Sequence, residues 1–228
     1  MKPSTLVLIL LILCSCTRSG DNSPEEMVPP VPEPTFDGSL SDIEKYYTPE
    51  LVEALKNLGF VIHTGSKPPE IEGIYEIAPS VIQASTTGID SIGKRLSDQT
   101  LTLSNQNNDS LTIDFKITGN GQTSLGKGSF ISGNDDTFSI FIKSETQNEG
   151  YLAVETATAI TGTTSKTGIL NFQFAGLMLD DKSDPDNQYI ENNTGRLIYD
   201  SDKASPEIGL INDQVSRYQH ALLSIHPY

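Results

Sequence analysis

The chain has 228 residues, of which 30 are Asp or Glu and 15 are Lys or Arg, so its formal net charge is −15. This acidity argues against a nucleic-acid partner, because binding to phosphates needs a basic face. Both of its two cysteines lie near the N-terminus, which leaves the body of the chain without a thiol nucleophile or a cysteine-based zinc site.

Residues 1–15 have the pattern of an export signal. Lys2 precedes an unbroken apolar run, Leu6–Leu13, that is far shorter than the roughly 20 helical residues that a bilayer requires. No A-x-A-like cleavage site follows, and the four residues LCSC that end at Cys16 resemble a bacterial lipobox. The resemblance implies cleavage before Cys16 and lipidation of that cysteine. The alternative is a non-bacterial signal peptide in which the cysteines have no role.

The lipid on Cys16 would hold the protein on a membrane, and residues 16–38 would form a proline-rich tether. The prolines of this segment are Pro24, Pro29, Pro30, Pro32 and Pro34. Such a composition favours an extended, polyproline-like chain. We therefore expect an outer-membrane lipoprotein of the bacterial cell envelope that carries palmitate-type acyl chains. Whether the domain faces the periplasm or the cell surface stays open.

Residues 39–228 are expected to form a single β-rich domain that begins with a short amphipathic helix at about 48–59. Thr48 suits the N-cap, Pro49 suits the first turn, and Gly59 is a typical helix stop. The leucines between them recur on one face, so the helix should pack on the domain. An S-x-x-E pattern at Ser41–Glu44 predicts a capping box just before this helix.

From Phe60 onward the apolar period changes from about 3.6 to about 2 residues, which indicates strands. Apolar and polar residues alternate through Leu111–Ile117 and Leu170–Phe174, and apolar residues recur with the same period at Phe138, Ile140 and Ile142. Clusters of Gly, Asn and Asp separate these runs at hairpin-length intervals. The pattern predicts about nine strands in an antiparallel meander, folded as a barrel or as a β-sandwich.

Residues 68–75, PPEIEGIY, resemble the first strand of lipocalin-like (calycin-type) lipoproteins of Bacteroidetes. Gly73 and Tyr75 stand where lipocalins carry G-x-W, and residues 162–180 and 195–200 are similar to the same lipoproteins. The resemblance implies a calycin-like barrel, although this chain has no tryptophan. It also implies that Arg196 packs over Tyr75 to close the barrel base. An exposed arginine on an edge strand is the alternative for Arg196.

One acidic segment contains four weak candidates for metal ligands. They are Asp180, Asp181, Asp184 and Asp186. Lys182 and Pro185 interrupt the pattern of a calcium loop, so an acidic hairpin loop is favoured over a calcium site. The three histidines lack zinc-ligand spacing, and we find no nucleophile or nucleotide-binding motif, so we expect neither a cofactor nor catalytic residues.

Two functions of different classes fit these patterns. In the first, a lipid-anchored, lipocalin-like barrel binds a small apolar ligand in its mouth. In the second, a surface β-sandwich serves adhesion or glycan handling, although the lack of tryptophan weakens the case for a sugar-stacking platform. A hydrolase is the least favoured function, because no motif supports it. A pair of catalytic carboxylates would be recognised only in three dimensions, and nothing in the sequence selects one.

The lipobox is tested by Cys16→Ala. This variant should remain an uncleaved or soluble precursor, because the acyl acceptor is lost, and detergent phase partitioning would detect the change. Cys14→Ala is the matched control and should partition like the parent, since Cys14 leaves with the signal. A Cys16→Ala protein that still enters the detergent phase like the parent would exclude the lipobox.

Overall fold

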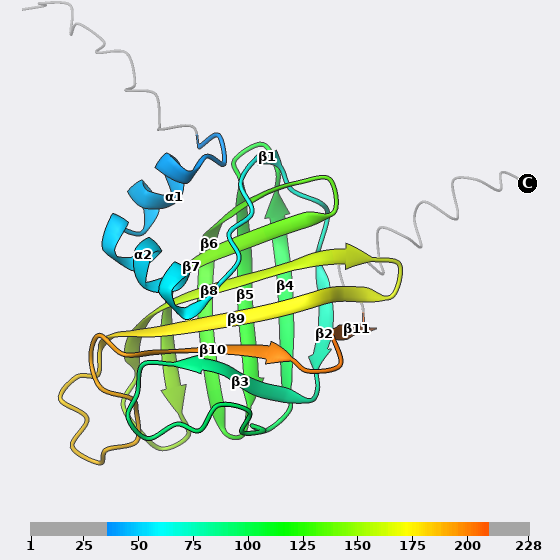
Figure 1. Ribbon diagram of the computed structural model, residues 1–228. Helices are drawn as coiled ribbons and strands as arrows, with labels where there is room; N and C mark the ends of the chain where they lie inside the picture. The colour runs from blue at the N-terminus through cyan, green and yellow to red at the C-terminus, as the bar shows by residue number, and fades with distance from the viewer. Residues whose placement is uncertain (1–35, 210–228) are drawn as a thin grey trace, which may run out of the picture. The chain divides into compact units, whose positions relative to one another are not determined.

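The computed structural model describes residues 36–209, so the predicted signal peptide, Cys16 and the tether up to residue 35 lie outside the described residues. Two short helices come first, α1 (Leu40–Tyr46) and α2 (Pro49–Leu58) (Figure 1). The strands are β1 (Ser66–Lys67), β2 (Gly73–Ile77), β3 (Ser80–Ser85), β4 (Gln99–Asn107), β5 (Thr112–Gly119), β6 (Gln122–Asn134), β7 (Thr137–Asn148), β8 (Val154–Ser165), β9 (Gly168–Asp180), β10 (Gly195–Asp200) and β11 (Ala204–Gly209). Neither α1 nor α2 is long and apolar enough to cross a membrane, and the described range has no other helix.

The helix predicted at 48–59 is confirmed as α2. The Thr48 side chain accepts a hydrogen bond from the backbone N–H of Leu51, and Gly59 ends the helix in the left-handed conformation with φ 87°. The capping box was predicted two residues too late. Ser39, not Ser41, caps α1, where it accepts from the N–H of Asp42 at 3.3 Å.

The strands form one sheet that is antiparallel except for the parallel pair of β1 with β6. Eight strands follow one another in a ring, in the order β11-β2-β4-β5-β6-β7-β8-β9, and β9 pairs again with β11. Strands β10 and β3 continue the sheet from the other part of β9. In Figure 1, β8, β9 and β10 pass crosswise in front of β4 and β5.

The predicted mainly β, antiparallel fold with a leading helix is therefore confirmed. The ring is not an even barrel, because β9 pairs both with β11, which closes the ring, and with β10, which extends the sheet to β3. A barrel and a sandwich of two crossed layers both describe it. Eleven strands occur within residues 36–209 instead of about nine, since short strands such as the two-residue β1 leave no period in the sequence.

Apolar side chains cover both faces of the middle strands. On the inner face, Tyr75, Leu101 and Ile117 lie opposite one another on β2, β4 and β5, and all three are buried. On the outer face of β6 and β7, the rings of Phe130 and Phe141 lie 6.1 Å apart between centroids. The helices cover this second layer, which is why the alternation with polar residues is lost there.

Tyr47, at the end of α1, joins the helices to the sheet. Its ring packs edge-on against Phe141 with centroids 5.5 Å apart, and only 3% of the residue is exposed. Its hydroxyl lies 2.9 Å from both the N–H and the carbonyl of Ile142, and it also donates to the carbonyl of Thr158. Burial raises the pKa of this hydroxyl well above its usual value, so it stays protonated and can donate.

Tyr47→Phe should lower the free energy of unfolding by about 1–3 kcal/mol, because it keeps the ring and leaves buried backbone groups unpaired. Urea unfolding would measure the loss. Tyr151→Phe is the matched control, since Tyr151 is 37% exposed, and its midpoint should stay near that of the parent. Equal midpoints for the two variants would contradict the anchoring role of the Tyr47 hydroxyl.

Candidate functional site

A cavity of about 540 Å³ lies at the end of the ring where β5 turns into β6 and β7 turns into β8. We call it the mouth cavity. It is lined by Gln99, Ser124, Thr146, Thr156, Thr158, Phe174, Gly176, Met178, Tyr189, Arg196 and Ile198, with further residues of the adjoining turns. Strands β6 to β8 supply one wall, and β9 and β10 supply the other. Its size is in the range of sites for small molecules, which is roughly 300–1,000 Å³.

One wall of the mouth cavity carries a chain of buried hydroxyl groups. The order of the chain is Ser124, Thr146, Thr156, Ser144, Thr158, and successive oxygens are 2.7 to 2.9 Å apart. Because a hydroxyl both donates and accepts, the chain can satisfy itself without other partners. This wall is therefore polar without being charged.

The opposite wall is largely apolar. Phe174 and Ile198 are neighbours on β9 and β10, and both line the mouth cavity. Met178 continues this wall on β9 and is buried. The site thus combines an apolar surface with a polar one, which suits a ligand that is itself amphipathic.

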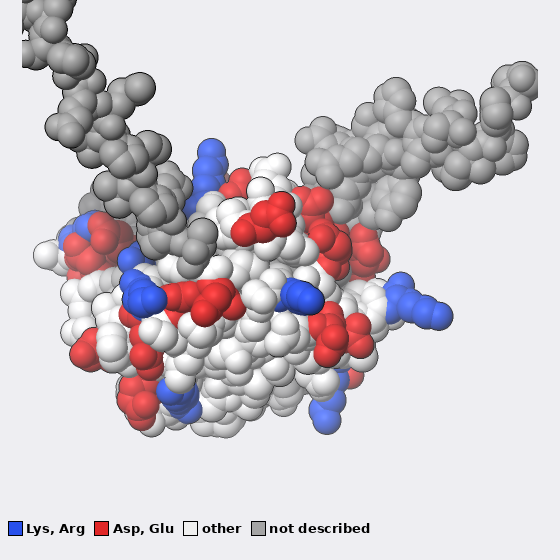
Figure 2. Space-filling view, turned by 90° about the horizontal axis from the view of Figure 1, so that it is seen from above, with Lys and Arg blue, Asp and Glu red and all other residues white. Residues whose placement is uncertain are grey.

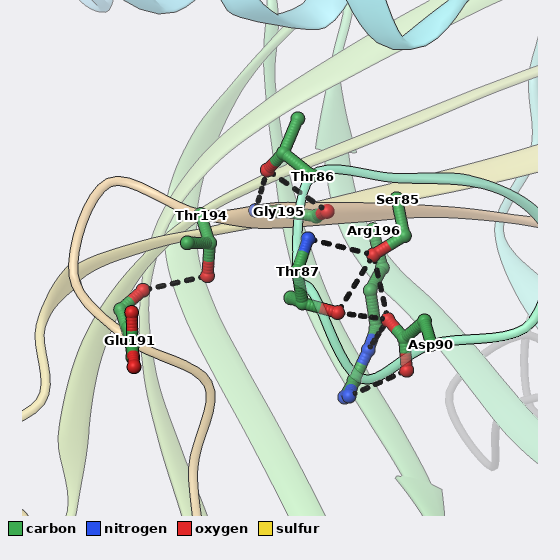
Figure 3. Close-up of polar contacts among 8 residues, drawn as sticks. All are labelled: Ser85, Thr86, Thr87, Asp90, Glu191, Thr194, Gly195 and Arg196. Atoms are coloured by element: carbon green, nitrogen blue, oxygen red, sulfur yellow. Dashed lines mark hydrogen bonds and ion pairs between the residues drawn. The ribbon is translucent and has the colours of Figure 1, made fainter.

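Arg196 reaches the mouth cavity from β10 and forms an ion pair with Asp90, which follows β3 (Figure 3). Its Nε donates to Oδ2 of Asp90 at 2.6 Å, and its Nη2 donates to Oδ1 at 2.9 Å. The hydroxyls of Ser85 and Thr87 donate to the same carboxylate at 2.6 and 2.7 Å. The side chain of Asp90 is only 5% exposed, and that of Arg196 is 32% exposed.

These contacts decide the charge of Asp90. Burial acts to raise the pKa of its carboxyl, but the hydrogen bonds from Arg196, Ser85 and Thr87 and the charge of Arg196 together hold that pKa well below its usual value. The carboxylate is therefore ionised at neutral pH, and it neutralises the guanidinium beside the cavity.

The two alternatives for Arg196 were stacking on Tyr75 and an exposed position on an edge strand. The structure instead pairs Arg196 with Asp90, on a strand that lies between β9 and β3. Within residues 36–209, the cation–π contact is that of Lys143 over the Tyr46 ring, 5.3 Å from its centroid. Tyr75 is buried, and its hydroxyl donates to the carbonyl of Ile71 at 3.0 Å. Gly73 packs closely beside it, because a Cβ there would lie 3.0 Å from the Tyr75 hydroxyl oxygen.

The acidic candidates lie at the end of β9 and in the loop between β9 and β10. They are Asp180, Asp181, Asp184 and Asp186. The carboxylates of Asp180 and Asp184 accept bonds from Lys182 Nζ and from the N–H of Tyr189, each at 2.7 Å. Across the described range, no group of three or more His, Cys, Asp or Glu side chains could hold a metal ion. The geometry is that of an acidic loop whose carboxylates hold its turns.

A second groove, of about 630 Å³, is lined by His63, Gln173 and Asp200 among others. The Asp200 carboxyl is buried, and its Oδ2 accepts from the N–H of Ala78 at 3.2 Å and from the hydroxyl of Ser205 at 2.8 Å. Burial raises its pKa. These bonds hold the start of β3 and the turn into β11, so we assign Asp200 a structural role.

Sequence reasoning missed Asp90, Gln99 and the hydroxyl wall. One signal for the wall was present in β7, where the apolar residues at 138, 140 and 142 give way to Ser144 and Thr146 on the same face. Asp90 had no comparable signal, because its partner Arg196 lies 106 residues further along the chain.

Comparison with protein-family models, with curated proteins and with solved structures finds no match for this chain. Figure 2 shows one face of the domain, on which Lys and Arg side chains are scattered among Asp and Glu. The mouth cavity is therefore characterised by its own geometry and chemistry.

Asp90→Asn should lower the free energy of unfolding by about 1–3 kcal/mol at pH 7, because it weakens hydrogen bonds to charged groups. A lowered pKa means that the ionised carboxylate stabilises the fold at neutral pH. This contribution should fall as the pH drops below about 4, the usual range for an aspartate, toward the pKa of the folded state. The difference in urea midpoint between the parent and the variant should therefore shrink steadily as the pH is lowered from about 4 to about 2.

Asp98→Asn is the matched control for this ion pair. Asp98 also binds an arginine, Arg95, but at 3.1 Å and with side chains that are 47% and 64% exposed. Exposed pairs contribute little to stability, so this variant should unfold like the parent at every pH. If Asp90→Asn gave the same difference from the parent at every pH, the pair would not be the cause.

Proposed function

We propose that this chain is an exported, lipid-anchored lipoprotein of the bacterial envelope whose β domain binds a small molecule in the mouth cavity. The lipobox-like segment that ends at Cys16 supports the anchor. The resemblance of residues 68–75 to lipocalin-like lipoproteins supports a barrel that binds ligands. The outer membrane is the proposed location.

The observation that carries the binding role is the mouth cavity itself. Its walls come from both crossed layers, and its lining offers apolar side chains on one wall and hydroxyls on the other. A small molecule there would be enclosed by two sides of the sheet. We therefore propose a ligand that has both an apolar part and a polar part, in place of the wholly apolar ligand that was expected from the sequence.

The alternative role in adhesion or glycan handling would be favoured by aromatic side chains on an open face. Among the exposed large apolar residues of the described range, Tyr151 is the aromatic one, and it lies at the rim of the mouth cavity. The proposal therefore places recognition in the cavity instead of on a flat surface. Neither the acidic loop nor His63 supports a hydrolase, and the sequence has no nucleophile motif.

The binding role is tested by filling the cavity with Gly176→Phe. Gly176 lies between Thr158 and Arg196 in the sheet and lines the mouth cavity. A Cβ there would meet only Phe174, at an ordinary 3.6 Å, so the new ring can enter the cavity. The parent should bind the neutral dye N-phenyl-1-naphthylamine at one saturable site in a fluorescence titration, and the variant should lose at least about tenfold in affinity.

Gly88→Phe is the matched control, because a Cβ at Gly88 would meet nothing within 4 Å. It adds the same ring in the loop after β3 and should bind the dye within about twofold of the parent. Thermal unfolding of the three proteins would show that each is folded. Equal dye affinities for the two variants would remove the mouth cavity as the binding site.

A further inference from the structure

We infer that the ligand of the mouth cavity is a neutral amphipathic molecule whose polar part carries several hydroxyl groups, such as an alkyl glycoside. This inference rests on the proposed binding function and adds the chemical class of the ligand. Three features of the lining carry it: the open ends of the hydroxyl chain, an unpaired carboxamide oxygen, and an arginine whose charge is already neutralised.

The hydroxyl chain has capacity left at its two ends. Within residues 36–209, the hydroxyl of Ser124 bonds only to that of Thr146, at 2.7 Å, and the hydroxyl of Thr158 bonds only to that of Ser144, at 2.9 Å. Both end residues line the mouth cavity. Because each end hydroxyl uses one of its three hydrogen-bonding positions within the chain, it can bond to a group in the cavity.

Gln99 adds an acceptor that lacks a partner. Its side-chain oxygen is buried and makes no hydrogen bond within residues 36–209, and the residue lines the mouth cavity at the start of β4. A buried polar atom without a partner destabilises the fold, so such an atom in a native site calls for an explanation. A hydroxyl donor on the ligand would supply the missing bond.

Arg196 adds a donor without a net charge. Its Nε and Nη2 bond to Asp90, and Nη1 makes no hydrogen bond to any residue from 36 to 209. Asp90 holds the guanidinium in place, so Nη1 can donate to an oxygen in the cavity. Glu149, in the turn after β7, also lines the cavity, although its side chain is exposed to solvent. An anionic ligand would have to compete with Asp90 and would meet the Glu149 carboxylate, and a cationic ligand would meet the guanidinium.

The pairing of Arg196 with Asp90 therefore favours a ligand whose polar group is neutral. The several acceptors in the cavity lining favour a polar group that carries several hydrogen-bond donors. The wall of Phe174, Met178 and Ile198 would cover the apolar part of the same molecule. A single alcohol group offers one donor and two acceptor positions, which is fewer than the lining can bond. An alkyl glycoside presents an apolar chain and a ring of hydroxyls at the same time.

The test uses four probes with the same eight-carbon chain, each below its micelle concentration, in isothermal titration calorimetry with the folded domain. They are n-octyl β-D-glucoside, 1-octanol, octanoate and octylammonium. We expect the glucoside to bind at least about tenfold more tightly than each of the other three. Gly176→Phe should abolish this binding, which assigns it to the mouth cavity.

Gln99→Met tests the contact to the unpaired oxygen. The variant keeps the length of the side chain and removes an acceptor that has no partner, so it should fold at least as stably as the parent. It should weaken glucoside binding by about three- to tenfold and change octanol binding by less than about twofold. Gln83→Met, at an exposed position of β3 outside the lining of the mouth cavity, should change neither.

The outcomes separate the two proposals. If octanol, octanoate or octylammonium bound as tightly as the glucoside, and Gly176→Phe blocked that binding, the hydroxylated ligand class would be overturned while the binding cavity stood. If Gln99→Met left glucoside binding unchanged, the contact to its oxygen would be overturned. If neither the glucoside nor the naphthylamine dye bound in the mouth cavity, both the ligand class and the proposed function would fall.

Discussion

The described domain depends on how β9 shares its hydrogen bonds. One edge of β9 pairs with β8 along most of its length, and the other edge is divided, with residues 168–170 paired to β11 and residues 173–177 paired to β10. The first part closes the ring through β2, and the second extends the sheet to β3. Gly168 permits the closure, since its φ is 144° and a Cβ there would lie 2.2 Å from the carbonyl oxygen of Ser205. Closure leaves fewer strand edges open to other chains.

In the closed ring, the two faces of the middle strands pack against different parts of the domain. Their inner faces pack against one another, and their outer faces receive α1 and α2, so β8 is buried without interruption from Thr156 to Gly162. A strand that is solvated on one face would alternate instead. The helices are thus part of the core, and Tyr47 fastens them to the sheet by its ring and its hydroxyl. A truncation that removes α1 would expose an apolar sheet face.

The mouth cavity follows from the same arrangement. The ring interior is filled by large apolar residues at one end, and at the other end the inward positions carry Ser and Thr, whose small side chains leave space between the layers. These hydroxyls are buried without a cost in unpaired groups because they bond to one another. Arg196 and Asp90 bring opposite charges to the rim of that space, and their mutual bonds keep the charge local. The result is a cavity that is polar on one side and apolar on the other, and the charged groups beside it are the Arg196–Asp90 pair and the exposed Glu149.

The features that could be predicted from the sequence are those that depend on interactions between residues close together in the chain. Thr48, Pro49 and Gly59 act on backbone groups within one helical turn. The two ends of α2 are therefore set by residues that lie at those ends in the sequence. The strands likewise follow from alternation between neighbours, as in Leu111–Ile117. The mainly β, antiparallel fold was therefore determined by the sequence without reference to any distant contact.

The features that only the tertiary structure decided all join residues far apart. The alternation is the same for a strand in a barrel and for one in a sandwich, so the division of β9 between β10 and β11 had no local signal. Arg196 could not be assigned to Asp90 instead of Tyr75, because the loop after β3 meets β10 only once the sheet has formed. The mouth cavity is likewise a space between two layers. It exists because the closed sheet holds those layers apart where their inward side chains are too small to meet.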